Sequence, residues 1–189
     1  VPPQGCADYA FQQHIQQSLD TKNGRSISLW PHGVLFRDKE TDMRRKMVEE
    51  DLVECVIGLG PNLFYNSSMT SCLLITNNNK RPKAKGKVLI IQAVEEVRKE
   101  QTMSYLDEHH IQRIHQAYLK FEDEEGFCSV VDIDTIAQDR DARMSVQLYV
   151  KGEAEEEVSF SDAYSAWQTS SRDLRLAMTD LFDNEAKTS

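Results

Sequence analysis

The sequence predicts a mixed α/β fold with a helical carboxyl-terminal tail, and three observations support this prediction. Short apolar runs alternate with helical patterns, which is typical of a sheet flanked by helices. The later runs follow one another too closely for a helical crossover, so those strands should be antiparallel. A charged stretch and a long amphipathic pattern come last, which predicts a division into residues 1–150 and residues 151–189.

Helices are expected where apolar residues recur every third or fourth position. The first begins at residue 7 and is stopped by Asn23–Gly24. The second lies within residues 39–51 and the third within 107–121. The expected inner residues are Phe11, Ile15 and Leu19 in the first, Met43, Met47 and Val48 in the second, and Ile111, Ile114, Tyr118 and Phe121 in the third. Arg44, Arg45 and Lys46 are expected to point largely outward.

Strands are expected at five apolar runs, namely residues 25–31, 52–60, 70–76, 87–93 and 127–136. A helix separates the first two runs, which predicts a parallel pair with a right-handed crossover. Only a turn separates the runs at 70–76 and 87–93, so these two are expected to be antiparallel.

The tail is expected to be one helix from Ser159 onward, and Ser159 and Asp162 have the spacing of a capping box. Apolar residues follow at alternating steps of four and three, which is the pattern of a packing seam. The seam consists of Phe160, Tyr164, Trp167, Ser171, Leu174, Met178 and Leu181. We therefore expect residues 160–182 to pack on another helix, through self-association or on a partner.

Composition excludes several classes of protein. The chain has 189 residues and a net charge of −9, whereas a free-standing nucleic-acid binder is usually basic. No apolar run approaches the roughly 20 residues of a membrane span, so no membrane partner is expected. The four cysteines form no C-x-x-C pair, which is typical of reduced thiols in the cytoplasm.

Motifs for catalysis or metal binding are weak. His109 and His110 are adjacent and His115 lies five positions on, which suits a solvated helix face better than a metal site. No metal site is therefore predicted. The segment from Gly58 lacks the third glycine of a dinucleotide fingerprint, and no nucleophile elbow or P-loop is present.

A basic segment spans residues 80–87 and has two interpretations. It is either a solvated turn that blunts a sheet edge or a contact to the phosphate backbone of DNA. Its charged residues are Lys80, Arg81, Lys83, Lys85 and Lys87.

Two large aromatic residues, Phe64 and Tyr65, stand between turn residues just before a strand. Ligands of α/β sheets bind outside the carboxyl ends of the strands. The expected parallel strands place this loop, with Asn62, on the same edge as the segment Pro31, His32 and Gly33. The two aromatics either close the end of the sheet as core or form part of an active rim.

Residues 24–79 resemble the modification subunit of type I restriction–modification systems, an adenine-specific DNA methyltransferase. The patterns P-H-G-V-L-F, E-x-D-L-x-x-x-x-I-G-L and N-L-F-Y carry the resemblance, and flanking stretches extend it over roughly residues 1–150. Residues 66–71 depart from the glycine, threonine and proline that are common there in the family. The resemblance implies a Rossmann-like methyltransferase sheet whose last strand is antiparallel.

The family implies S-adenosylmethionine as methyl donor, a glycine-containing cofactor loop and an N-P-P-F/Y motif. Neither motif is present in this chain, so we expect a carboxyl-terminal portion of such a subunit that binds no cofactor and has no catalytic residue of its own. The resemblance places Phe64, and in second place Tyr65, against the adenine extruded from the duplex.

The partners that the family implies are double-stranded DNA, a specificity subunit and a restriction subunit. An alternative of another class is a non-enzymatic docking module that acts through its helical tail, which the acidic balance and the apolar seam also suit.

Overall fold

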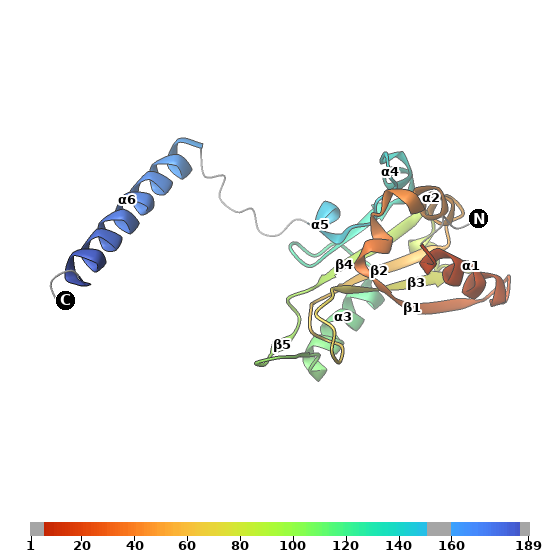
Figure 1. Cartoon of the computed structure of the whole chain (residues 1–189). Helices are drawn as coiled ribbons and strands as arrows, with labels where there is room; N and C mark the ends of the chain where they lie inside the picture. Colours follow the sequence, from red (N-terminus) through yellow and green to blue (C-terminus); the bar gives the residue numbers. More distant parts are fainter. Residues whose placement is uncertain (1–5, 151–159, 186–189) are drawn as a thin grey trace. The chain divides into compact units, whose positions relative to one another are not determined.

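The computed structural model describes residues 6–150 and 160–185, and the chain divides into two compact units, Val1–Gly152 and Glu153–Ser189. In the first unit, helices lie on both faces of a five-stranded sheet (Figure 1). The helices are α1 (Asp8–Ser18), η1 (His32–Leu35), η2 (Asp38–Glu40), α2 (Thr41–Glu49), η3 (Pro82–Ala84), α3 (Glu108–Lys120), α4 (Ile133–Gln138), α5 (Val146–Tyr149) and α6 (Phe160–Glu185). The strands are β1 (Arg25–Pro31), β2 (Val53–Leu59), β3 (Ser71–Asn77), β4 (Lys87–Ala93), β5 (Arg98–Lys99), β6 (Ser104–Tyr105) and β7 (Cys128–Asp132).

The sheet has the strand order β1-β3-β2-β4-β7 and is mixed, as expected. β3 is antiparallel to both β1 and β2, β4 is parallel to β2, and β7 is antiparallel to β4. The prediction that β1 and β2 pair with each other was wrong. The two strands do run in the same direction, but β3 lies between them and forms hydrogen bonds with both. β3 and β4 run in opposite directions, with β2 between them.

The inner strands β2, β3 and β4 are packed on both faces, which explains why they are continuous apolar runs, whereas Ile27 and Leu29 of the edge strand β1 are exposed. α1, α2 and α4 cover one face (Figure 1), where the core includes Tyr9, Leu35, Met47, Val48, Leu74, Ile90 and Met144. α3 packs on the other face, where the core includes Cys55, Ile57, Leu89, Ile91, Ala117, Phe121 and Phe127. All four cysteines are free thiols, and three of them are buried in strands.

The inner face of α1 differs from the prediction, because hydrogen bonds rather than apolar periodicity orient the helix. Tyr9 and Gln12 are its buried residues, and Phe11 is exposed. The Tyr9 hydroxyl donates to the carbonyl oxygen of Val34 at 3.1 Å, and Gln12 Oε1 accepts a hydrogen bond from the Trp30 indole at 2.9 Å. α1 also ends earlier than predicted, at Ser18.

Two further predictions were wrong. Arg44 was expected to point outward from α2 but is fully buried. Its guanidinium donates to main-chain carbonyl oxygens of the segments before α2 and after α4, and these bonds offset the cost of burying the charge. The strand expected over residues 127–136 ends at Asp132, and α4 begins at Ile133.

The second unit contains α6, a single helix of 26 residues, as predicted. Trp167, Leu174 and Met178 are exposed along it. The predicted capping residue Ser159, the charged stretch 151–157 and the side chains of Phe160, Asp162 and Leu181 lie outside the described residues.

Candidate functional site

Two segments that the sequence assigned to one edge of the sheet do meet there. Pro31 at the end of β1 and Leu59 at the end of β2 both lie opposite Ser71, the first residue of β3. The backbone N–H of His32 donates to the carbonyl oxygen of Thr70 at 3.2 Å and joins the two segments. We call residues 31–36 and 60–70 together the rim.

The loop between β2 and β3 has a defined backbone. Asn62 and Asn66 have φ values of 60° and 55°, in the left-handed region that asparagine tolerates better than most residues. The N–H of Ser67 donates to the carbonyl oxygen of Phe64 at 3.1 Å, which closes a tight turn. Phe64 is therefore the first residue of this four-residue turn, and Tyr65 and Asn66 are its two central residues.

Side chains of this loop differ in exposure, which bears on whether they are core. Leu63 packs against the core cluster beneath α3. Phe64 is 37% exposed and Tyr65 is 82% exposed. Tyr65 is therefore not a core residue, and Phe64 is covered in part while presenting the rest of its ring to solvent.

The first rim segment carries a half-buried histidine. Burial lowers the pKa of His32, so its imidazole is neutral at pH 7. Its Nε2 has no hydrogen-bond partner among the described residues. Its ring lies edge-on to that of Phe36, with 6.2 Å between the ring centroids. Gly33 lies in η1 beside the guanidinium of Arg37, where a Cβ would come within 2.6 Å of Nε.

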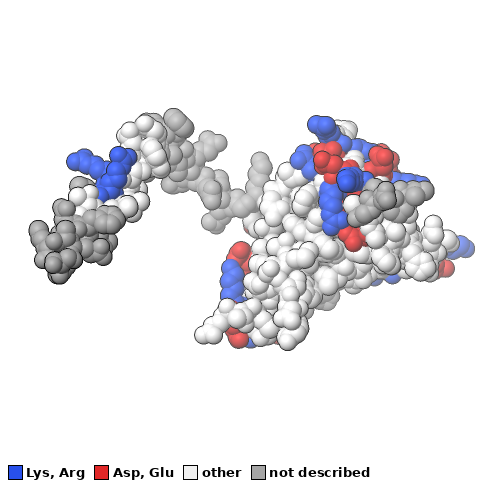
Figure 2. All heavy atoms as spheres, in the orientation of Figure 1, with Lys and Arg blue, Asp and Glu red and all other residues white. Residues whose placement is uncertain are grey.

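Charged side chains gather away from the middle of the face shown in Figure 2. Acidic and basic residues cluster over α2 and α4 and again at the β5 end of the unit, with a mainly uncharged surface between them. An uncharged surface offers little attraction to a phosphate.

Much of the basic segment forms internal contacts. Lys80 is buried, and its Nζ lies 2.5 Å from Asp51 Oδ1 and 2.8 Å from the carbonyl oxygen of Lys87. Arg81 and Lys83 donate to carbonyl oxygens at the carboxyl end of α3, where cations are favourable. Lys83, Lys85 and Lys87 are exposed, but only Lys85 and Lys87 have neither a side-chain hydrogen bond nor an ion pair among the described residues. The segment precedes β4, which is parallel to β2, so it lies at the edge opposite the rim.

A polar cavity of about 450 Å³ at that opposite edge was not predicted. Glu54 is fully buried at an irregularity between Val53 and Cys55, and its Oε2 accepts hydrogen bonds from Asn77 and Tyr118 at 3.0 and 2.9 Å. Arg25 and Arg81 lie 3.6 and 3.9 Å from its carboxylate. The one available signal was an acidic residue inside an otherwise apolar strand.

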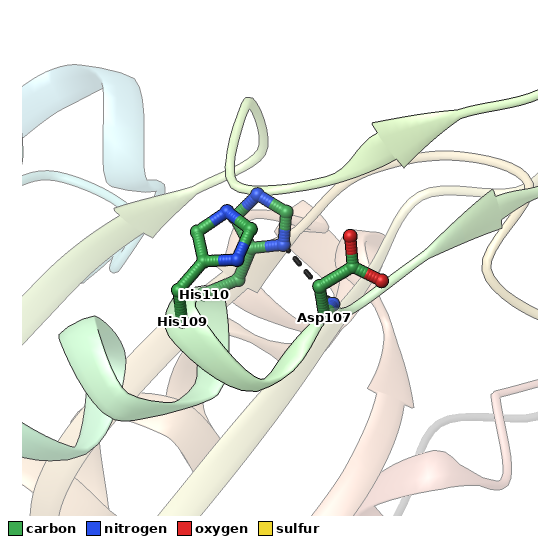
Figure 3. Close-up of side chains that lie close together, drawn as sticks. All are labelled: Asp107, His109 and His110. Carbon is green, nitrogen blue, oxygen red and sulfur yellow. Dashed lines mark hydrogen bonds between the residues drawn. The ribbon is translucent and has the colours of Figure 1, made fainter.

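Asp107, His109 and His110 form a cluster whose potential ligand atoms lie within 4.8 Å of one another (Figure 3). The N–H of Asp107 donates to His110 Nδ1 at 3.1 Å, and the Asp107 carboxylate accepts from the N–H of His110, which is a capping box at the start of α3. Arg98 also binds this carboxylate. The cluster is explained by helix capping, and we assign no metal to it.

Within the described residues, no helix combines the length and apolar character that crossing a membrane requires.

The mixed sheet with its inserted antiparallel strand is a Rossmann-like methyltransferase fold, and known structures agree. The methyltransferase subunit of a type I restriction–modification system from Streptococcus thermophilus superimposes with a TM-score of 0.71 and 32% sequence identity, over 78% of this chain and 31% of that chain. The M protein of the type I restriction enzyme EcoKI matches with a TM-score of 0.51 and 23% identity, over 62% of this chain and 26% of that chain, which supports the fold alone.

The family model for N-6 DNA methylase matches residues 1–158, and the chain belongs to that family. Among curated relatives, the MjaVIII methylase subunit of Methanocaldococcus jannaschii is 36% identical over 168 residues, or 86% of this chain and 28% of the relative. The HindI methylase subunit of Haemophilus influenzae is 36% identical over 95 residues, or 49% of this chain and 21% of the relative. The resemblance to type I modification subunits is thus confirmed, and the chain spans less than a third of the length of these relatives.

Proposed function

We propose that this chain forms the target-base side of an adenine-specific DNA methyltransferase, the modification subunit of a type I restriction–modification system. The observation that carries the proposal is the rim: Phe64 and Tyr65 are exposed on an ordered turn at the carboxyl edge of a methyltransferase sheet. In such sheets ligands bind at this edge. In the whole subunit, the methyl group would pass from S-adenosylmethionine to the adenine amino group.

The residues of this chain do not fit the cofactor. The sequence has neither the N-P-P-F/Y motif nor the glycine-containing cofactor loop of the family, so we assign it no residue that holds the sulfonium or the target amino group. We therefore derive no catalytic step here and assign this chain one task, which is to receive the extruded base. The isolated chain is expected to bind no S-adenosylmethionine.

Receiving an extruded base requires an apolar face that replaces the lost stacking. Phe64 is 37% exposed, so its ring is covered in part and loses less side-chain entropy when a base stacks on it than a fully exposed ring would. Tyr65 is 82% exposed and is the second candidate for stacking on the base. The neutral His32 and the segment Pro31–Gly33 line the same edge without adding a charge.

The proposed partners are double-stranded DNA, a specificity subunit and a restriction subunit, all in the cytoplasm. Trp167, Leu174 and Met178 on α6 are exposed and are the proposed docking surface for a specificity subunit or a second copy. The same surface supports the second candidate function, a docking module without catalytic activity. The proposed contacts to the phosphate backbone of DNA are limited to Lys85 and Lys87, because Lys80, Arg81 and Lys83 form contacts within the chain.

The test uses the complete subunit assembled with its specificity subunit. Phe64→Ala removes a stacking face worth ~1–3 kcal/mol, which corresponds to a loss of roughly 5- to 150-fold in methylation efficiency. The affinity for S-adenosylmethionine should stay unchanged, since no cofactor contact is removed. Full methylation by a stable Phe64→Ala enzyme would contradict the proposal.

A further inference from the structure

The rim loop begins against a segment that comes later in the chain. β2 and β4 are parallel neighbours, and Leu59 is paired with Ala93 at their ends. The next residues, Gly60 and Val94, therefore lie side by side. A Cβ on Gly60 would lie 2.5 Å from the carbonyl oxygen of Val94, too close for any side chain. The glycine permits the loop to leave β2 in direct contact with the turn that follows β4.

A second contact follows two residues later. The backbone N–H of Ser104 in β6 donates to the carbonyl oxygen of Asn62 at 2.8 Å, and Ser104 is buried. Asn62 has a left-handed backbone, with a φ of 60°, which is uncommon outside glycine and persists where surrounding contacts hold it. The bond to Ser104 thus acts on the residue that sets the direction of the chain toward Phe64.

The hairpin that supplies this bond is itself braced. Ser104 is paired with Lys99 across β5 and β6. Arg98 Nε lies 3.1 Å from Asp107 Oδ2. The guanidinium of Arg98 also stacks 5.0 Å from the centre of the Tyr105 ring.

Asp107 in turn forms the capping box of α3 with His110, as the dashed bond in Figure 3 shows. α3 packs on the sheet through Ala117, and Phe121 directly after the helix belongs to the same core cluster. A chain of contacts therefore runs from the buried face of the sheet, through the start of α3 and the hairpin, to the rim loop.

We propose that residues 94–107 are a positioning clamp for the rim loop, with Gly60 and the Ser104 N–H as its contact points. The clamp fixes the backbone at Asn62 and so presents Phe64 to the extruded base. Ser104 and Gly60 are positioning residues, since neither would touch the base. This inference rests on the proposed function for the role of the loop but not for its conformation.

Hydrogen exchange of backbone amides in this chain tests the conformational part. Ser104→Pro removes the N–H donor, and loss of about 1.4 kcal/mol should accelerate exchange of the hydrogen-bonded loop amides, those of Ser67 and Met69, about tenfold while β2 and β3 stay protected. Gln101→Pro is the matched control, because it places proline at the exposed hairpin tip without touching the loop. Ser104→Ala keeps the N–H and should retain the protection of the loop.

Gly60→Ala provides an independent variant from the loop side, which decides the matter if Ser104→Pro does not fold. Its Cβ should push the loop away from Val94 and accelerate the same amides. Wild-type exchange of the Ser67 and Met69 amides in both folded variants would overturn the clamp.

Methylation by the complete subunit tests the functional part. Ser104→Pro should lower methylation efficiency about tenfold with cofactor affinity unchanged, and Gln101→Pro should not. A loosened loop with full methylation would also overturn the positioning role. If Phe64→Ala leaves methylation unchanged, the proposed function fails instead, while the exchange experiment still decides whether the clamp exists.

Discussion

Arg44 Nε donates a hydrogen bond to the carbonyl oxygen of Ala142 at 2.8 Å, and so joins two residues that are 98 positions apart. The same buried guanidinium donates to the carbonyl oxygens of Arg37 and Asp141. One side chain in α2 thereby holds the segment before it and the loop after α4 in place.

Replacing Arg44 by methionine should destabilise the chain by ~3–5 kcal/mol, because several buried carbonyl oxygens lose their donor at once. The carbonyl of Val34 would keep one donor, the Tyr9 hydroxyl. Urea unfolding measures the effect. Lys46→Met, on the exposed face of the same helix, is the control and should change stability by less than about 0.5 kcal/mol. Equal losses in the two variants would show that the Arg44 bonds contribute little.

How far the sequence predicts this fold depends on whether the interactions are local. The strands at residues 25–31, 70–76 and 87–93 were located within a residue, because apolar runs bounded by turn residues are local signals. The rim was also predicted, since the direction of β1 and β2 decides where their loops leave the sheet. Strand order was not predicted, because nothing in the periodicity says that β3 fits between β1 and β2.

Buried charges were the other failure, and the reason is again distance along the chain. The local sequence predicts Arg44 to be a surface residue, because nothing near it in the chain indicates that its guanidinium donates to the carbonyl oxygen of Ala142. Glu54 accepts a hydrogen bond from Tyr118, 64 positions away. Helical periodicity predicts which residues face inward, but it does not predict which polar residues find partners there.

A pH dependence of stability is expected from the thiol of Cys72, which lies in β3. Burial raises its pKa from 9.0 to about 12. Above pH 9 the unfolded chain releases this proton while the folded chain keeps it, so stability falls as pH rises through the window from 9 to 12. At pH 10 this loss is about 1.4 kcal/mol.

Cys72→Ala should remove that part of the alkaline loss. The variant is less stable than the wild type at pH 7, where the thiol is protonated in both states, and this difference is the reference. The difference should shrink by about 1.4 kcal/mol at pH 10. Urea unfolding at the two pH values measures it, and a constant difference would show that the thiol does not titrate as inferred.

The exposed residues of α6 lead to a prediction about assembly. Trp167, Leu174 and Met178 recur at steps of seven and four and share one side of the helix. A double change, Leu174→Glu with Met178→Glu, should lower the mass of a self-associated chain or weaken binding to a specificity subunit at least about tenfold. Light scattering and titration calorimetry measure the two outcomes.

Gln168→Glu with Thr179→Glu is the matched control, since it adds the same charge at exposed polar positions of α6. Unchanged mass and unchanged binding in the Leu174 and Met178 variant would rule out this side of α6 as a docking surface.

The last prediction separates stacking from packing at Phe64. Phe64→Leu keeps an apolar side chain at this position but removes the aromatic face. Phe64→Trp keeps a face and enlarges it. If Phe64 stacks on the base, the tryptophan enzyme should retain most of its methylation efficiency, and the leucine enzyme should lose several-fold, approaching the ~1–3 kcal/mol of a full stack.

If Phe64 is instead a packing residue, the order reverses. Leucine is then the milder change, and tryptophan costs ~1–3 kcal/mol by overfilling its site. Melting temperature, cofactor affinity and methylation measured on the same samples distinguish the two cases. Because Phe64 is 37% exposed, replacing it costs less stability than replacing a fully buried phenylalanine. A leucine enzyme that is stable and fully active, beside an unstable tryptophan enzyme, would assign Phe64 to the core and leave Tyr65 as the remaining aromatic on the rim.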